Sequence, residues 1–129
     1  MKHLFVFIFT LFVSFSAVAV SSNVANTFAQ SGTGKASYYG EYFHGRKTAN
    51  GSIFNQNALT AAAAPHIKMN SYLLVTNLKT GKSVVVKVTD RGAFHKTKYG
   101  NRTLDLSKVA FSKIAPLSQG VIAIKYKVL

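Results

Sequence analysis

Three side chains carry all the carboxyl groups of this chain: Glu41, Asp90 and Asp105. Carboxyl groups are the usual acids and bases that break glycosidic bonds, and hydrolysis commonly needs a pair of them. Internal attack by a hydroxyl group of the sugar is less demanding, because one carboxyl group can protonate the leaving oxygen and deprotonate the attacking hydroxyl. Any carboxyl chemistry in this protein therefore depends on these three residues.

Asp90 is the candidate whose surroundings best suit such chemistry. It ends a run of β-branched residues in the stretch TDRGAF, and a carboxylate at a strand end can face a cleft. The alternative is that Asp90 pairs with Arg91 or caps a turn, and the sequence favours neither role. Asp105 precedes an expected helix and is expected to hold backbone amides there. Glu41 is expected to be a solvated charge in a loop.

Other reactive groups are scarce or poorly spaced. The chain has no cysteine, so we expect no thiol nucleophile, no disulfide and no cysteine-linked lipid anchor. His44, His66 and His95 lack the paired spacing of a zinc site. No serine stands in a GxSxG context. We therefore expect no metal and no other cofactor.

Aromatic side chains crowd the stretch that follows the first expected strand. They are Tyr38, Tyr39, Tyr42, Phe43 and Phe54. Flat rings beside basic groups can stack on sugar rings or on nucleic-acid bases, although core packing is expected to take some of these rings. Residues 41–57 are rich in Gly, Asn and Thr and show no periodicity. We expect a long loop there, and such loops in compact domains often carry function.

The first residues have the order of a secretory signal. Lys2 is followed by an almost unbroken apolar run over residues 4–13, and the stretch Ala17-Val18-Ala19 fits an A-x-A cleavage site. A second candidate cut lies after Ala29. An uncleaved membrane anchor is the less favoured alternative, because the apolar stretch is shorter than the about 20 residues that a spanning helix needs.

The rest of the chain has room for one domain. We expect a signal peptide over residues 1–19, a small polar linker over 20–34 and a single domain over 35–129. The charge is strongly unbalanced, with 16 Lys and Arg against three acidic residues. Such a surface attracts polyanions, which for an exported protein are the cell wall, anionic lipid head groups or extracellular nucleic acid. Charge alone does not choose among them, and a merely basic surface is the remaining alternative.

Short β-branched and apolar runs separated by turn signals predict a small β-domain. The runs span residues 35–40, 59–64, 71–77, 82–89 and 121–128. Lys79-Thr80-Gly81 signals a hairpin between two of these runs. Ser107 is expected to cap a short helix with the sequence KVAFSKIA. Short strands with one or two small helices indicate a compact β-barrel.

Several stretches, in this order, resemble one protein family. They are GKASYYG, YFHGRKTANG, NALTAA, SYLLVTNLKTGKSVVVKVTDRGAF and LDLSKVA, and the similarity to the RlpA (rare lipoprotein A) family runs over residues 34–129. The resemblance implies an all-β fold, a six-stranded double-psi β-barrel shared with expansins and barwin-like proteins. It also implies a septal, periplasmic lytic transglycosylase that cleaves the MurNAc–GlcNAc bond of glycan strands lacking stem peptides and leaves 1,6-anhydro ends.

The resemblance also implies roles for individual residues. The family's catalytic aspartate corresponds to Asp90, which would protonate the scissile oxygen and then accept the proton of the muramic O6. The residues expected to bind substrate are Tyr39, Phe43, His44, Arg46, Thr48, Asn50, His66 and Arg91.

This chain departs from the family pattern at a few positions. Where the family reads GExFD this chain reads GSIFN, so Ser52 replaces a glutamate that is thought to assist catalysis and Asn55 replaces an aspartate. The family's TAAH histidine position holds Ala63, and His66, three residues on, is the candidate substitute. The alternative function is therefore a non-catalytic wall-binding module of the expansin kind.

The expected setting follows from the signal and the resemblance. We expect an exported monomer, located in the periplasm or at the cell wall and without a lipid anchor. Its expected ligands are denuded glycan strands, and septal cell-division proteins are candidate partners. A basic nucleic-acid binder is the weakest alternative, because no nucleic-acid motif is recognised and the secretory signal would be unexplained. We therefore expect no nucleic-acid partner.

Overall fold

The computed structural model describes residues 28–92 and 102–129. The predicted signal peptide, most of the predicted linker and His95 lie outside these residues. The elements, with η for a 3₁₀ helix, are β1 (Ser31–Tyr38), η2 (Glu41–Phe43), β2 (Thr60–Ala63), β3 (Tyr72–Asn77), β4 (Ser83–Arg91), β5 (Leu104–Leu106), α2 (Lys108–Ile114), η4 (Leu117–Gln119) and β6 (Ile122–Val128).

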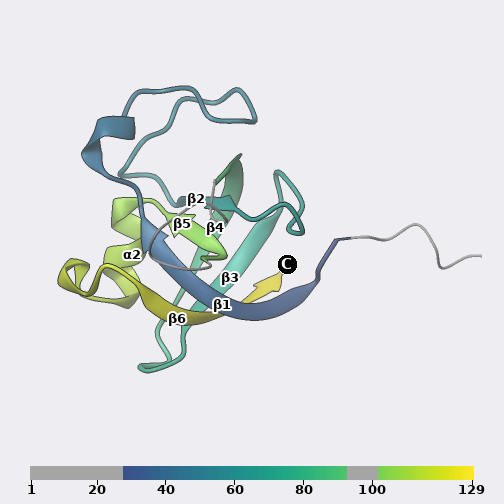
Figure 1. The fold of residues 1–129 in the computed structure, drawn as a ribbon, viewed down its shortest axis with the longest axis vertical. Helices are drawn as coiled ribbons and strands as arrows, with labels where there is room; N and C mark the ends of the chain where they lie inside the picture. The colour runs from purple at the N-terminus through teal and green to yellow at the C-terminus, as the bar shows by residue number, and fades with distance from the viewer. Residues whose placement is uncertain (1–27, 93–101) are drawn as a thin grey trace, which may run out of the picture.

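Six strands among the described residues close into a double-psi β-barrel in the order β1-β5-β2-β4-β3-β6. The pairs β1–β5 and β2–β4 are parallel, and the other four pairs are antiparallel. Figure 1 shows the long loop between β1 and β2 rising at the top of the view, while β1 and β6 run side by side lower down. The predicted all-β, six-stranded barrel is confirmed.

The core follows from strand alternation. Alternate residues of β3 and β4 are apolar and buried over most of each strand, as the pairs Leu73–Val86 and Val75–Val84 illustrate. Phe111 of α2 is fully buried and packs into the same cluster. Burying each such side chain contributes about 1.5–3 kcal/mol, so the alternation is enough to specify which face of each strand points inward.

Two local predictions are confirmed. Ser107 caps α2, because its hydroxyl accepts a hydrogen bond from the Ala110 amide at 3.2 Å. The turn between β3 and β4 forms a hairpin in which Gly81 has a φ of 78°, a left-handed conformation that glycine adopts without strain. Among the helices of the described segments, none has the length and apolar character needed to cross a membrane.

Two features differ from the sequence expectations. β5 is an additional strand of three residues, too short to show periodicity, and it is held by β1 on one side and β2 on the other. β1 begins at Ser31, within the segment expected to be linker, because residues 31–34 pair with β6. A run of small polar residues is typical of a linker, but pairing with β6 makes residues 31–34 part of the barrel.

Candidate functional site

One row of outward-facing side chains crosses four strands of the barrel. Ser37 on β1 pairs with Asp105 on β5, Asp105 pairs with Ala62 on β2, and Ala62 pairs with Asp90 on β4. We call these four residues the carboxyl row. Neighbouring strands are about 4.8 Å apart, which places the Cα atoms of the two aspartates about 10 Å apart. Only the small side chain of Ala62 stands between them in the row, and it is buried in a cluster with Tyr39 and Phe54.

A β-bulge puts Asp90 in this row. Ala61 pairs with Val88, but Ala62 pairs with Asp90, so Thr89 is the extra residue in β4. The alternate valines before it point into the core, and strict alternation would send Asp90 inward as well. The bulge instead brings the carboxyl group to the outside of the barrel.

Asp90 is held by three donors. Its Oδ2 accepts a hydrogen bond from the Tyr39 hydroxyl at 2.9 Å, and its Oδ1 accepts from the backbone amides of Ala49 at 3.0 Å and Arg91 at 2.8 Å. A carboxyl group in which both oxygens accept hydrogen bonds has the bonding pattern of an ionised carboxylate. Asp90 thus accepts hydrogen bonds from backbone amides of a turn, which is the capping role considered in the sequence analysis. It also lies at the end of β4, as predicted.

The Arg91 guanidinium points away from the carboxylate of Asp90. Its Nη1 donates weak hydrogen bonds to the carbonyl oxygens of Ala63 and Ala64, at 3.4 and 3.3 Å. Over the described ranges the single salt bridge joins Lys108 and Glu41, so Asp90 and Arg91 do not form an ion pair. Arg91 therefore positions the neighbouring strand, and its expected role in substrate binding stays a prediction.

Tyr39 fixes Asp90 from a buried position. Its ring stacks on Phe54 with centroids 4.4 Å apart and meets Phe43 edge-on at 5.5 Å. Burial, and then the hydrogen bond to Asp90, raise the pKa of Tyr39 far above its ordinary value. The hydroxyl therefore remains protonated and acts as a permanent donor to the carboxylate.

Asp105 has a different environment from the one expected. Its Oδ1 accepts a hydrogen bond from Ser37 Oγ at 3.0 Å, and Arg102 Nη1 donates to the same Oγ at 3.0 Å. Among the described residues no backbone amide donates to this carboxyl group, so the prediction that Asp105 holds amides before the helix is wrong. Burial raises the pKa of Asp105 from 3.8 to about 6, Ser37 and Arg102 oppose the rise, and the charge of Asp90 adds to it.

The turn over residues 48–52 lies next to Asp90 and carries the family departure. The buried Thr48 donates from Oγ1 to Asn50 Oδ1 at 2.7 Å, and Ser52 donates from N and Oγ to the same oxygen at 3.0 and 2.6 Å. The Asn50 amide donates to the carbonyl of Thr89 at 3.1 Å. Ser52 therefore belongs to a closed, neutral hydrogen-bond network.

An aromatic platform stands on the loop beside this turn. Tyr42 and Phe43 are 70% and 44% exposed, with centroids 5.4 Å apart, and the Arg46 guanidinium lies 4.0 Å above the Tyr42 ring. His44 is exposed next to them, and its Nδ1 accepts a hydrogen bond from the Gln56 amide at 3.2 Å. The predicted binding residues of this loop are thus close together, and large apolar surfaces there face solvent.

His66 is not brought to the carboxyl row by any observed contact. It lies exposed in the turn after β2, and within the described parts of the chain its ring makes no hydrogen bond. Ala63, at the family's histidine position, is buried in the core. The described residues contain no group of three potential ligands that could hold a metal ion.

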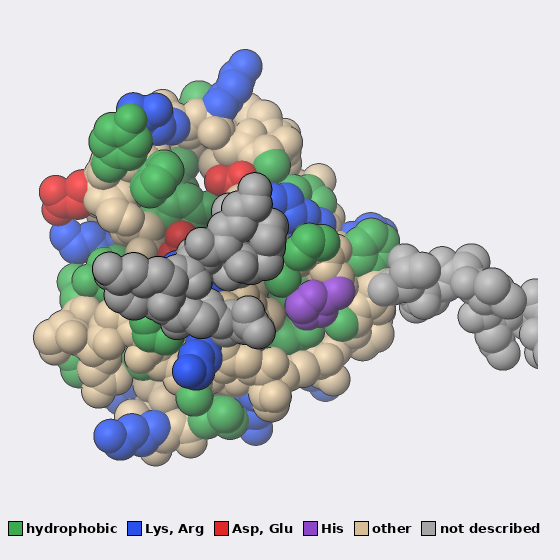
Figure 2. Space-filling model, in the orientation of Figure 1, with side chains coloured by type: hydrophobic (Ala, Val, Ile, Leu, Met, Phe, Trp, Pro, Cys, Tyr) green, Lys and Arg blue, Asp and Glu red, His purple; other side chains and the backbone are tan. Residues whose placement is uncertain are grey.

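Glu41 is the solvated charge that the sequence predicted. It is 75% exposed and pairs with Lys108 at 3.0 Å. Figure 2 shows the acidic side chains in the upper half of the view, around the long loop, whereas Lys and Arg are scattered over the whole visible face. The three carboxyl groups of the chain are thus gathered on one part of the molecule.

Comparison with known proteins decides the family. Residues 31–126 match the profile of the family described as lytic transglycolase. The chain belongs to the lytic transglycolase family. The resemblance to RlpA seen in the sequence is confirmed, because the chain is 50% identical over 93 residues to the endolytic peptidoglycan transglycosylase RlpA of Neisseria meningitidis and 47% identical over 96 residues to that of Campylobacter jejuni.

These relatives are longer proteins. The matched part covers 72% and 74% of this chain but only 37% and 33% of the two relatives. Solved structures agree on the fold: a Streptomyces papain inhibitor matches with a TM-score of 0.59 at 27% identity, covering 79% of this chain and 96% of that one. An expansin mutant of Clavibacter michiganensis, in complex with cellohexaose, matches at 0.57 and 22% identity, covering 77% and 50%.

Sequence reasoning missed the arrangement around Asp105. Ser37 lies far in the sequence from Arg102 and Asp105, and only the pairing of β1 with β5 brings Ser37 and Asp105 together. One signal was present, since Asp105 alternates with Leu104 and Leu106 as an outward residue of a strand does.

Proposed function

We propose that this family member is a lytic transglycosylase that cleaves the MurNAc–GlcNAc bond of denuded glycan strands with Asp90 and Asp105 as its working pair. The carboxyl row carries this proposal, because it places two carboxyl groups of different character on one side of the barrel with a small residue between them. The relatives named RlpA support the reaction class.

Asp105 is the acid of the pair. A pKa of about 6 keeps a substantial fraction of its carboxyl groups protonated in mildly acidic solution. It donates its proton to the bridging glycosidic oxygen while the bond from that oxygen to C1 of the muramic ring breaks. The Arg102–Ser37 arrangement then stabilises the carboxylate that forms, since the Ser37 hydroxyl donates directly to it.

Asp90 is the base of the pair. As an ionised acceptor it takes the proton of the muramic O6 hydroxyl while that oxygen attacks C1, which closes the 1,6-anhydro ring. No water enters the product, and the two carboxyl groups exchange protons with solvent to begin the next cycle. This proposed division of work differs from the mechanism expected from the sequence, in which Asp90 makes both proton transfers.

The loop supplies binding surface next to the pair. Tyr42 and Phe43 offer exposed rings for sugar faces, and Arg46 adds a positive charge for the lactyl carboxylates of muramic acid. Because the proposed substrate is peptidoglycan, the protein would act outside the cytoplasmic membrane. Export by the predicted signal peptide, a monomeric state and contacts with septal proteins are part of the same proposal.

Digestion of amidase-treated glycan strands, followed by mass spectrometry, tests the function. We expect products with 1,6-anhydro ends from the parent protein and none from Asp90→Asn. Reducing ends would identify water as the nucleophile and contradict the mechanism.

A second function, binding without cleavage, is favoured by one observation. The neutral network of Thr48, Asn50 and Ser52 fills the position where the family has a glutamate. In this case the parent protein would bind denuded strands and release no product. Ser52→Glu, compared with Ser52→Gln, would then show whether a carboxyl group at this position creates activity.

A further inference from the structure

The side of the barrel across from the carboxyl row carries a second outward-facing arrangement. Lys127 on β6 pairs with Ser31 on β1 and with Leu74 on β3, and Lys125 pairs in the same way with Thr33 and Thr76. We call these six residues the lysine face. In the barrel order β3 and β6 lie opposite β5 and β2, so the lysine face and the carboxyl row occupy opposite sides.

The lysine face is positive and has no acidic side chain to balance it. The three carboxyl side chains of the chain are Glu41 and the two aspartates of the row on the other side. Lys125 and Lys127 are exposed and take part in no salt bridge within the described residues. Residues two apart along a strand are about 7 Å apart and point to the same side, so Lys125 and Lys127 leave β6 on the same exposed face.

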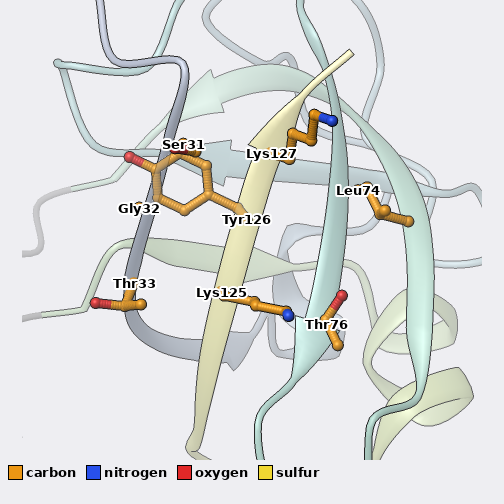
Figure 3. Close-up of a pocket in the computed structure, with 8 residues that line it drawn as sticks. All are labelled: Ser31, Gly32, Thr33, Leu74, Thr76, Lys125, Tyr126 and Lys127. Carbon is orange, nitrogen blue, oxygen red and sulfur yellow. The ribbon is translucent and has the colours of Figure 1, made fainter.

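A trough runs across this face. It has a volume of about 400 Å³, and its walls are formed by the side chains of the lysine face together with Gly32 and Tyr126. Figure 3 shows Lys125 and Lys127 on the side toward β3, and the Tyr126 ring reaching toward β1. The trough is thus lined by serine and threonine hydroxyl groups, by lysine ammonium groups and by the apolar side chain of Leu74.

Tyr126 brings an unused hydrogen-bonding group to the trough. Its ring lies against Gly32, where an added Cβ would come within 2.8 Å of the hydroxyl oxygen. The residue is 4% exposed, and within the described residues its hydroxyl makes no hydrogen bond. The hydroxyl is not among the buried side-chain atoms that lack a partner, so it is open to the trough, where a ligand can replace water as its hydrogen-bond partner.

We propose that the lysine face binds a second acidic glycan strand while the carboxyl row works on the first. This inference rests on the proposed function for the identity of the polymer. Ammonium groups complement the lactyl carboxylates of muramic acid, and the hydroxyl groups complement the sugar hydroxyls. A flat lipid surface would contact the lysines but leave the trough empty, whereas a polysaccharide chain fills it.

The test measures affinity for sacculi stripped of stem peptides, in the inactive Asp90→Asn background so that the strands stay intact. Lys125→Gln with Lys127→Gln removes two charges from the lysine face. Lys68→Gln with Lys113→Gln removes two charges from other exposed positions and is the matched control. Each lysine that contacts the strand should contribute about 1 kcal/mol of binding free energy. We therefore expect the substitutions on the lysine face to weaken binding about tenfold or more, and the control substitutions to weaken it less than about threefold.

Tyr126→Phe provides a probe that does not alter charge. It keeps the ring and removes the hydroxyl, so we expect sacculus binding to weaken by about threefold to tenfold without a change in salt dependence. Equal losses from the two lysine pairs would overturn the proposal, since net charge alone would then explain binding. Loss of binding to phosphatidylglycerol vesicles with unchanged sacculus binding would assign the face to lipid instead.

Failure of this inference is distinguishable from failure of the proposed function. Cleavage of short soluble denuded fragments by the lysine-face variants with Asp90 intact reports on the carboxyl row alone. We expect that cleavage to remain within about twofold of the parent, because these fragments are too short to reach both sides of the barrel. If the parent protein cleaves nothing, but substitution of Lys125 and Lys127 still weakens sacculus binding, the proposed function fails and the lysine face remains a glycan-binding site.

Discussion

The two sides of the barrel place their outward residues in contrasting surroundings. On the β5–β2 side, Asp90 lies under the turn at 48–52 and Asp105 is partly buried, and the charge of Asp90 helps to raise the pKa of Asp105. On the β3–β6 side, Lys125 and Lys127 stand open to solvent. Regular strand alternation exposes the two lysines, whereas the bulge at Thr89 brings Asp90 to the outside of the barrel. The difference shows what partial burial does to an outward polar residue: it raises the pKa of Asp105, because desolvation disfavours the charged form of its carboxyl group.

Removing the base should have the largest effect. Asp90→Asn keeps the size and polarity of the side chain but cannot accept a proton, so we expect cleavage to fall about 10³-fold or more. Binding to sacculi should stay within about threefold of the parent, because the lysine side is unchanged. Product assays on denuded strands and a sacculus pull-down measure the two effects, and substantial residual cleavage would move the base elsewhere.

Removing the acid should separate activity from stability. Asp105→Asn still accepts the Ser37 hydrogen bond but has no proton to donate, so we expect cleavage to fall about 10²–10³-fold. Because the asparagine avoids a buried charge, the unfolding free energy above pH 6 should rise by about 1–3 kcal/mol. Urea denaturation at pH 7.5 measures this gain, and Glu41→Gln is the control at an exposed carboxyl group.

The same residue predicts a pH dependence of stability. Between about pH 4 and 6 the unfolded chain loses the proton of Asp105 while the folded protein keeps it, so the folded state binds more protons there. Stability from this group is therefore greatest below pH 4, decreases as pH rises and is lost above about pH 6. Activity should also decrease above pH 6. Denaturation curves of the parent and Asp105→Asn should diverge across this window, and parallel curves would contradict the assignment.

Tyr39→Phe should have a smaller effect on the carboxyl side. The ring stays stacked on Phe54, but the hydrogen bond to Asp90 is lost, which corresponds to about 1.5–3 kcal/mol for a charged acceptor. We expect cleavage to fall about tenfold to a hundredfold, with the KM for soluble fragments unchanged. Steady-state kinetics tests this, and a change confined to KM would point to a role in binding.

Salt should have the mildest effect, confined to the exposed side. Exposed charges are screened over about 10 Å at 0.1 M salt, so sacculus binding should weaken steadily as salt increases. The pKa of the buried Asp105 should shift much less over the same range. A pull-down across a salt series, with pH titrations at two salt concentrations, compares the two sides. Flat binding would indicate that the aromatic platform of Tyr42 and Phe43 dominates.

The sequence predicted those parts of the molecule that depend on local patterns. Alternation revealed β3, β4 and β6, and the residue types around Ser107 and Gly81 identified a helix cap and a turn. The contacts of Asp105 were not predicted, because the parallel pairing of β1 with β5 determines its partners and no local sequence pattern encodes that pairing. The resemblance suggested His66, three residues after the family's histidine position, as a substitute near the cleft, and the structure places it exposed in the turn after β2.

The bulge at Thr89 means that the pair of aspartates depends on a residue count as well as on residue identity. Deleting Thr89 would leave Asp90 as the next residue after Val88, opposite Ala62, but with one residue fewer to hold its approach to the turn at 48–52. Inserting one more residue would move Asp90 away from the row. During evolution of this barrel, a one-residue insertion in β4 could therefore abolish the site in a single event, whereas loss of Thr89 would leave the carboxyl group opposite Ala62. Homologous sequences should accordingly be compared by strand register, because an alignment shifted by one position would match Asp90 with a residue on the other face.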